Sequence, residues 1–213
     1  MEFIDPELDQ YVCQHSQPEP SVLQELNRKT HLEVLQPRML SGHFQGRVLS
    51  MLSHMIRPKR VLEIGTYTGY SALCFAEGLA EEGKVITIDV NEELEDLVKE
   101  YIAKSGMDDK VEYLMGDAAH FIPALHEEWD IVFIDADKKS YIKYYELVFD
   151  KVKKGGYIIA DNVLWSGKVL EDYESLDMET KIIMDYNNMV HNDPRVEHVL
   201  LPIRDGLMIA RKL

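Results

Sequence analysis

From Arg60 onward, short apolar runs alternate with helical stretches, and this alternation limits the possible folds more than any other feature of the sequence. The runs are rich in Ile and Val and lack strict polar alternation, which is typical of strands covered on both faces. Strand–helix repetition predicts an α/β fold with a doubly wound, mostly parallel sheet. The predicted strands are Val61–Ile64, Val85–Ile88, Val111–Leu114, Ile131–Ile134 and Tyr157–Ala160, and the predicted helices are 70–80, 92–105, 118–126 and 140–152.

The C-terminal part departs from this rhythm. A helix with Ile182, Tyr186 and Met189 on one face is followed by two apolar segments, Val196–Ile203 and Leu207–Ala210, around an Asp-Gly pair. Asp-Gly between apolar segments is typical of a β-hairpin. The sheet is therefore expected to end in an antiparallel pair, unlike a purely parallel dinucleotide-binding sheet.

The first part of the chain is predicted to be helical. At 213 residues, one domain is expected, with a helical arm at 1–57 and a sheet core at 58–213. The features that predict three helices in the arm are the spacing of Ile4, Leu8 and Val12, the capping-box pair Ser21 and Gln24, and the residues Val48, Leu52 and Met55 after Gly42.

Composition excludes several functional classes. Lys and Arg total 23 against 38 Asp and Glu, a net charge of −15 without a basic run, so nucleic-acid binding is not expected. The N-terminus lacks a signal-peptide pattern, and no apolar run approaches the ~20 residues of a membrane span, so we expect a cytoplasmic protein with no membrane partner. Cys13 and Cys74 cannot form a disulfide framework, and Cys74 is expected to be buried.

Ligands of an open α/β sheet bind beyond the carboxyl ends of its strands, and glycine or polar residues follow every predicted strand. Gly65 and Gly69 flank the first of these turns, where backbone can approach a ligand. Tyr67 and Tyr70 occupy positions at which a dinucleotide fingerprint has glycine, and Glu63 would repel a phosphate. The pattern favours a nucleoside cofactor with a cationic part, whose ribose Asp89 would bind.

A second group of polar residues follows the fourth and fifth strands. Asp135, Asp161 and Asn162 would converge if these strands are neighbours, and two carboxylates with an amide oxygen suit Mg²⁺, Mn²⁺ or Ca²⁺. Lys138 is a candidate base if the cation and burial lower its pKa. Two plainer interpretations stay open: Asp161 and Asn162 cap the following turn, and Lys138 is a solvated loop lysine.

Three separated motifs resemble those of the cation-dependent O-methyltransferases, the family of the catechol and caffeoyl-CoA enzymes. They are Val61–Ser71, Ile134–Lys138 and Ala160–Trp165, and the details are closer to the bacterial and caffeoyl-CoA-like branch. The resemblance extends over nearly the whole chain. It implies a Rossmann-like methyltransferase fold, S-adenosylmethionine as methyl donor, a divalent cation, a small hydroxyl-bearing acceptor and often a homodimer, for which the first helices would supply the interface.

The resemblance also implies roles for individual residues. Those implied or expected to hold the cofactor are Ser41, Glu63, Gly65, Thr66, Tyr67, Ser71, Asp89, Asp117, Ala118, Asp135 and Asp137. The implied metal ligands are Asp135, Asp161 and Asn162, with Lys138 and Asp135 as the catalytic pair. Lys138, Trp165, Ser166 and Asp205 match positions near the acceptor.

Two other functions are compatible with parts of the sequence. A non-catalytic protein could bind the cofactor and act through a partner, although the intact set Asp135, Lys138, Asp161 and Asn162 argues against this. An NAD-linked oxidoreductase is disfavoured by the bulky residues of the first turn.

Overall fold

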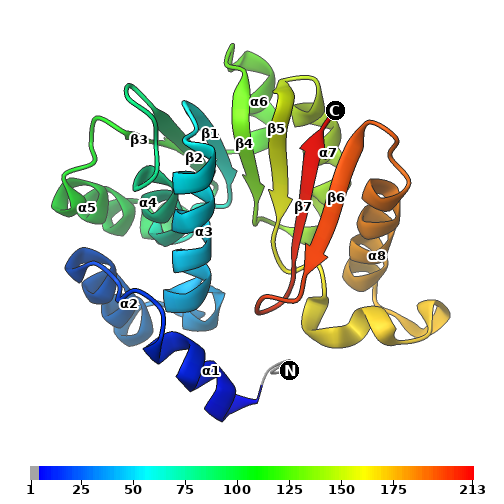
Figure 1. Ribbon diagram of the computed structural model, residues 1–213, viewed down its shortest axis with the longest axis horizontal. Helices are drawn as coiled ribbons and strands as arrows, with labels where there is room; N and C mark the ends of the chain where they lie inside the picture. Colours follow the sequence, from blue (N-terminus) through cyan, green and yellow to red (C-terminus); the bar gives the residue numbers. More distant parts are fainter. Residues whose placement is uncertain (1–4) are drawn as a thin grey trace. The chain divides into compact units, whose positions relative to one another are not determined.

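The computed structural model describes residues 5–213, which divide into two compact units, 5–118 and 119–213 (Figure 1). The first unit contains α1 (Pro6–Gln14), α2 (Ser21–Glu33), η1 (Pro37–Met39), α3 (Gly42–Ile56), β1 (Arg60–Ile64), α4 (Tyr70–Ala76), β2 (Lys84–Asp89), η2 (Glu92–Leu94), α5 (Glu95–Ser105) and β3 (Val111–Met115). The second contains β4 (Trp129–Ile134), η3 (Lys138–Ser140), α7 (Tyr141–Phe149), β5 (Val152–Ala160), η4 (Trp165–Leu170), η5 (Tyr173–Ser175), α8 (Met178–His191), β6 (Val196–Leu201) and β7 (Leu207–Lys212). Helix α6 (Ala118–Ala124) begins at the boundary.

The strands of the first unit are parallel and run in the order β3-β2-β1. Ile64 pairs with Ile88, and Ile88 with Leu114, so the three strands end side by side. Consecutive residues such as Val61 and Leu62 are both fully buried. Burial on both faces explains why these strands have continuous apolar runs.

In the second unit, β4 and β5 are parallel, and β5, β7 and β6 are antiparallel neighbours. Helix α7 packs on β4 and β5, and α8 packs on β6 (Figure 1). The predicted parallel strands and the C-terminal antiparallel pair are therefore confirmed. The predicted first strand of the pair is too long, because β6 ends at Leu201 and the chain turns at Ile203–Gly206.

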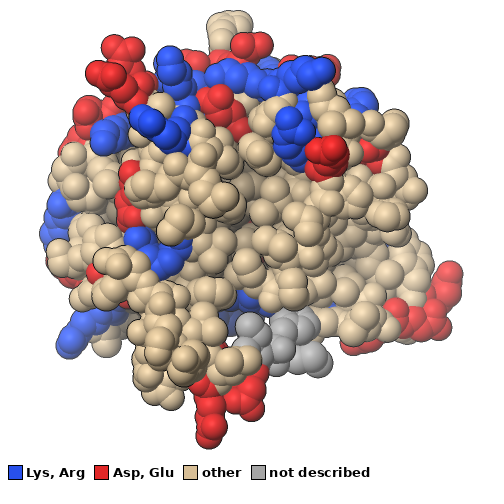
Figure 2. Space-filling model, in the orientation of Figure 1, with Lys and Arg blue, Asp and Glu red and all other residues tan. Residues whose placement is uncertain are grey.

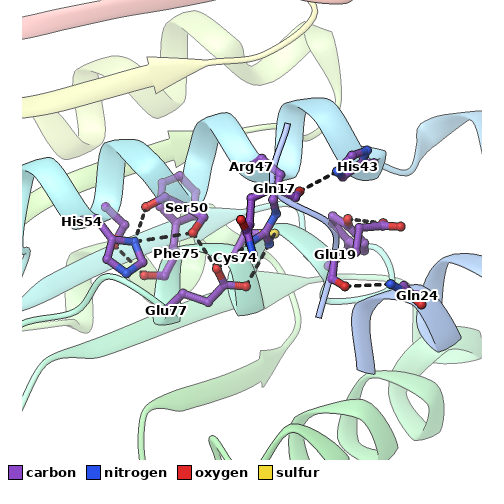
Figure 3. Close-up of polar contacts among 12 residues, drawn as sticks. Gln17, Glu19, Gln24, His43, Arg47, Ser50, His54, Cys74, Phe75 and Glu77 are labelled. Atoms are coloured by element: carbon purple, nitrogen blue, oxygen red, sulfur yellow. Dashed lines mark hydrogen bonds and ion pairs between the residues drawn. The ribbon is translucent and has the colours of Figure 1, made fainter. Parts of the chain in front are cut away.

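The capping box predicted for α2 is wrong. Ser21 is already the first residue of the helix, behind Pro20, and no side chain caps this end. Gln24 instead donates from Nε2 to the Glu19 carbonyl oxygen at 2.8 Å (Figure 3). In the preceding segment, Ile4 lies outside the described residues, and Leu8 on α1 is exposed.

Helix α3 turns a partly polar face toward its own unit. Met55 is 75% exposed, whereas Leu49, Ser50 and Ser53 are buried. Ser53 Oγ donates to the Phe75 carbonyl oxygen at 2.6 Å. Arg47 pairs with Glu77 at 2.8 Å (Figure 3). Because buried polar groups are tolerated once they are hydrogen-bonded, these contacts replace the apolar packing that Val48, Leu52 and Met55 suggest.

Helix α8 is also rotated from the predicted face. Its buried apolar residues are Ile183, Tyr186 and Val190, while Ile182 and Met189 are only half-buried. Tyr186 packs edge-to-face against Tyr141 of α7, with ring centroids 5.6 Å apart. Tyr186 belongs to both the predicted and the observed buried face. The helical spacing was therefore predicted correctly, but the buried face is shifted by one residue at its other two positions.

On the face shown in Figure 2, Lys and Arg side chains gather along the upper edge, with Asp and Glu side chains among them. Within residues 5–213, no helix has the length and apolarity to cross a membrane. Cys74 is buried, as predicted.

Candidate functional site

The turn between β1 and α4 is the best-defined part of the predicted cofactor site. Gly65, Tyr67 and Gly69 have φ values of 100°, 51° and 85°, in the left-handed region that favours glycine. The Tyr67 amide donates to Asp89 Oδ2 at 2.7 Å, which stabilises the turn. Asp89 Oδ1 accepts the Asn91 amide at 2.9 Å. Each carboxylate oxygen has a second lone pair, so Asp89 can still accept bonds from a ribose.

Glu63 is fully buried in β1, beside that turn. Thr87 of β2 donates to Glu63 Oε2 at 2.5 Å, and the Thr66 and Thr87 hydroxyls are 2.6 Å apart. A buried carboxylate needs such donors to offset its lost hydration. Through Thr87, the buried Glu63 carboxylate is thus connected to Thr66, which lies in the turn between β1 and α4.

The other cofactor candidates of the first unit lie on neighbouring segments. Ser71 is buried in the first turn of α4, and Ser41 is buried just before α3. Asp117 is exposed and Ala118 buried after β3, whose following residue Gly116 donates to the Asp89 carbonyl oxygen at 2.7 Å. The parallel order β3-β2-β1 therefore brings Asp89 and the residues after β3 together.

The second group of predicted residues lies in the second unit, beyond β4 and β5. Ile134 pairs with Ala160, and the Asp161 amide donates to the Ile134 carbonyl oxygen at 3.0 Å. Asp135 and Asp161 therefore follow adjoining strand ends. The Asn162 amide donates to Asp161 Oδ1 at 2.7 Å, so part of the turn-capping interpretation holds.

Lys138 points into this group. Its Nζ donates to Asn162 Oδ1 at 2.7 Å and to Asp135 Oδ1 at 3.4 Å. The side chain is only 9% exposed, so the alternative of a solvated loop lysine is wrong. Its ammonium lies 4.6 Å from the centroid of the Tyr141 ring and 5.7 Å from that of the Trp165 ring.

Sequence reasoning missed Tyr141. Lys138 Nζ donates to its hydroxyl at 2.5 Å, and this hydroxyl donates to the Asp161 carbonyl oxygen at 2.9 Å. Complete burial, with smaller effects from the charges of Asp135 and Asp161, raises the pKa of Tyr141 well above its usual value. The only available signal was the three-residue spacing from Lys138, which places both on one side of a helical turn.

Asp137 does not share the contacts of Asp135. Its Oδ1 accepts the Ser140 hydroxyl at 3.0 Å, and its Oδ2 accepts the Tyr144 hydroxyl at 3.4 Å. These bonds close the turn that leads into α7. In the structure, Asp137 therefore binds side chains of its own turn and of α7. Its contact with a cofactor stays a prediction.

The segment after β5 has an unusual backbone. Asn162, Trp165 and Ser166 have φ values of 58°, 47° and 55°, a conformation that costs non-glycine residues free energy. Asp205 from the β6–β7 turn holds the segment: its Oδ1 accepts the Ser166 amide at 2.5 Å, and its carbonyl oxygen accepts the Leu164 amide at 2.8 Å. Burial raises the pKa of Asp205, partly offset by the Ser166 bond.

Gly206→Ala is expected to disturb this segment. Gly206 has φ +91°, and a Cβ there would lie 2.5 Å from Leu164 Cγ and 3.0 Å from Leu164 N. We expect a loss of about 1–3 kcal/mol in the free energy of unfolding, because strain and overpacking add. Urea unfolding checks this. Gly106→Ala is the control, since Gly106 also has positive φ (+67°) but nothing within 4 Å of the added Cβ.

The donor set of the second unit fits a hard divalent cation. Asp135, Asp161 and Asn162 supply carboxylate and amide oxygens, and two of the three accept bonds from the single positive group of Lys138. Within residues 5–213, no group of three or more His, Cys, Asp or Glu side chains is placed to hold a metal ion. The predicted set has only two carboxylates and depends on the amide oxygen as its third ligand.

Comparisons with known proteins agree with this picture. Caffeoyl-CoA O-methyltransferase of Medicago sativa is 35% identical over 186 residues, 82% of this chain and 75% of the relative. An O-methyltransferase from Bacillus cereus, solved in complex with SAH (S-adenosylhomocysteine), has a TM-score of 0.87 with 30% identity, covering 97% of both chains. An SAH-bound methyltransferase from Podospora anserina has a TM-score of 0.89 with 26% identity over the full length of both. The Rossmann-like methyltransferase fold is thereby confirmed.

The family model described as O-methyltransferase matches residues 13–213. This match includes both groups of polar residues and the seven strands found among residues 5–213. The family expected from the three motifs is thus confirmed, and the chain belongs to the O-methyltransferase family.

Proposed function

We propose that this O-methyltransferase transfers the methyl group of S-adenosylmethionine to one hydroxyl of a small catechol-like acceptor, with a divalent cation bound by Asp135, Asp161 and Asn162. The observation that carries the proposal is the buried Lys138 ammonium, which donates to oxygens of two of these three residues. A buried amine that contacts oxygens of two proposed metal ligands suits a metal-assisted proton transfer. The solved SAH complexes of relatives support the choice of methyl donor.

The cofactor is proposed to bind at the turn between β1 and α4. Gly65 and Gly69 carry no side chain that would keep a ligand from their backbone, and Gly65 is half-buried. Buried Glu63 supplies negative charge near a sulfonium, and Asp89 supplies acceptors for the ribose hydroxyls. Ser41, Ser71, Asp117 and Ala118 complete the proposed contacts.

Lys138 is proposed to take the proton from the acceptor hydroxyl. When bound, the cation would lower the pKa of that hydroxyl, and the sulfonium would supply an activated methyl group. Lys138 Nζ accepts the proton in its neutral form, while Asn162 and Tyr141 hold the amine in place. Trp165, Ser166 and Asp205 are proposed to border the acceptor, and the Asp205 bond to Ser166 keeps that segment in its strained shape.

We propose an acceptor with two adjacent hydroxyls. Several relatives carry the name caffeoyl-CoA O-methyltransferase, and a caffeoyl group has two adjacent aromatic hydroxyls. The net charge of −15 weakly disfavours a polyanionic CoA ester. We therefore expect a smaller, less charged molecule with adjacent hydroxyls.

Two measurements test the proposed function. Isothermal titration should show binding of S-adenosylhomocysteine and not of NADH; tight NADH binding without S-adenosylhomocysteine binding would establish the oxidoreductase alternative. A methyl-transfer screen over catechols, flavonoids and caffeoyl-CoA, with and without Mg²⁺, should give cation-dependent product. If the chain binds S-adenosylhomocysteine but methylates none of these with any divalent cation, the non-catalytic alternative gains support.

We further propose that the chain acts as one methyltransferase domain, in the cytoplasm, as a homodimer whose interface involves the first helices. The family match from residue 13 onward supports the single domain. Exposed Tyr11 on α1 and Leu32 on α2 are apolar residues available for an interface. Light scattering during size-exclusion chromatography should report twice the chain mass, and Tyr11→Glu with Leu32→Glu should reduce it to the monomer.

A further inference from the structure

The Lys138 amine is held in place by several hydrogen bonds, although it stands at the end of a flexible side chain. Three groups accept bonds from its Nζ, and two of them, Asn162 Oδ1 and Asp135 Oδ1, belong to the proposed metal site. The third is the Tyr141 hydroxyl, at 2.5 Å. A lysine side chain has four rotatable bonds, so its amine keeps one position only when hydrogen-bond acceptors hold it.

The Tyr141 hydroxyl is itself fixed from two sides. It donates its proton to the Asp161 carbonyl oxygen at 2.9 Å, so its oxygen lone pairs face the Lys138 ammonium. The side chain is fully buried, and its ring packs edge-to-face on Tyr186. The hydroxyl therefore has a fixed place between the end of β5 and the lysine.

We propose that Tyr141 is the positioning residue of Lys138, linking the amine to the backbone of Asp161 so that base and proposed metal ligand keep one fixed geometry. This inference rests on the proposed role of Lys138 in methyl transfer. An oriented base is far more effective than a mobile one, and a displacement of about 1 Å can lower a rate ~10²-fold. Tyr141 acts through Lys138 and touches no reacting atom.

Chemical footprinting tests the placement without any cofactor or metal. The purified full chain is acetylated with acetic anhydride, and mass spectrometry follows Lys138 and its neighbour Lys139. Lys139 is 66% exposed and serves as the internal reference. In Tyr141→Phe, Lys138 should be acetylated several-fold faster relative to Lys139 than in the wild type. An unchanged ratio overturns the proposal, whether or not the protein methylates anything.

Kinetics test the functional consequence. Tyr141→Phe should lower kcat about 10- to 100-fold with little change in the KM of either substrate, because binding groups are untouched. Tyr145→Phe is the matched control: Tyr145 lies on the same helix and also packs on Tyr186, at 6.1 Å between ring centroids, but its hydroxyl bonds Asp193. It should keep wild-type kcat. An equal loss in both variants would show a general packing defect and overturn the proposal.

A double variant separates positioning from any independent role of the phenol. In a Lys138→Met background, adding Tyr141→Phe should cause no further loss of kcat, since the hydroxyl has no amine left to place. A further tenfold loss would mean that Tyr141 acts without Lys138, which contradicts the proposal. If Tyr141→Phe fails to fold, Asn162→Ala in the footprinting assay provides the second test: the remaining partners, Tyr141 and Asp135, should then keep Lys138 slower than Lys139, and equal rates would overturn the proposal.

Discussion

Asp161→Ala is expected to abolish methyl transfer, and excess EDTA is expected to do the same to the wild type. The Asp161 carboxylate is buried, and its Oδ1 accepts the amide of Asn162, whose side-chain oxygen accepts a bond from Lys138. A metal acting as a Lewis acid contributes several kcal/mol to a transition state, which corresponds to about 10²–10⁴-fold in rate. Turnover measured with a radiolabelled methyl donor, and Mn²⁺ binding followed by paramagnetic resonance, would both report the loss.

Two controls make this result specific to the cation. Asp185→Asn removes one carboxylate from α8, where it accepts the Tyr173 hydroxyl at 3.2 Å, and should leave turnover unchanged. EDTA-treated wild type should recover when Mg²⁺ is added back. Full methyl transfer in excess EDTA would exclude a role for the metal, and Asp161 would then have to act through its bond to the Asn162 amide.

Lys138→Met is expected to lower kcat about 10²–10⁴-fold, the range typical of a lost general base. Methionine keeps much of the apolar stem of the lysine and removes the amine that donates to Asn162 and Tyr141. Binding of S-adenosylhomocysteine should be unchanged, because the residues proposed to hold the sulfonium and ribose belong to the first unit. Cation affinity should be equal or higher, because a positive charge beside the carboxylate of Asp135 is gone.

Lys139→Met is the matched control, since Lys139 is the next residue and its ion-pair contact is with Glu179, at 3.9 Å. It should retain wild-type kcat. Loss of cation binding in Lys138→Met would show that the lysine organises the metal ligands rather than acting as a base. Wild-type kcat in Lys138→Met would exclude both roles.

The parallel strands were predictable because burial on both faces requires a continuous apolar run along the strand. A strand covered on both faces must be apolar at successive positions, as Val61 and Leu62 are, and this pattern is visible in the sequence. Helical faces were less predictable. In α3, Ser53 packs inward because its hydroxyl reaches the Phe75 carbonyl oxygen, a partner 22 residues away that no local pattern reveals.

The same distinction applies to the candidate site. Positions after strand ends could be read as ligand positions because parallel strands place their ends together, which brings Asp135 beside Asp161. The contacts within the group could not be predicted. Tyr141 looks like an ordinary core tyrosine in the sequence, and only the packing of α7 against the end of β5 brings its hydroxyl to the Asp161 carbonyl oxygen.

The sequence by itself determined the strands, the hairpin, the family and the residue types available for chemistry, because all of these follow from patterns that neighbouring residues share along the chain. The tertiary structure alone decided which face of each helix is buried, that Lys138 is held among oxygens rather than solvated, and that Asp205 holds the strained segment at Ser166. These properties depend on distances between residues far apart in the sequence. A hydrogen bond is made only when donor and acceptor lie within about 3.5 Å, and folding, not composition, sets that distance.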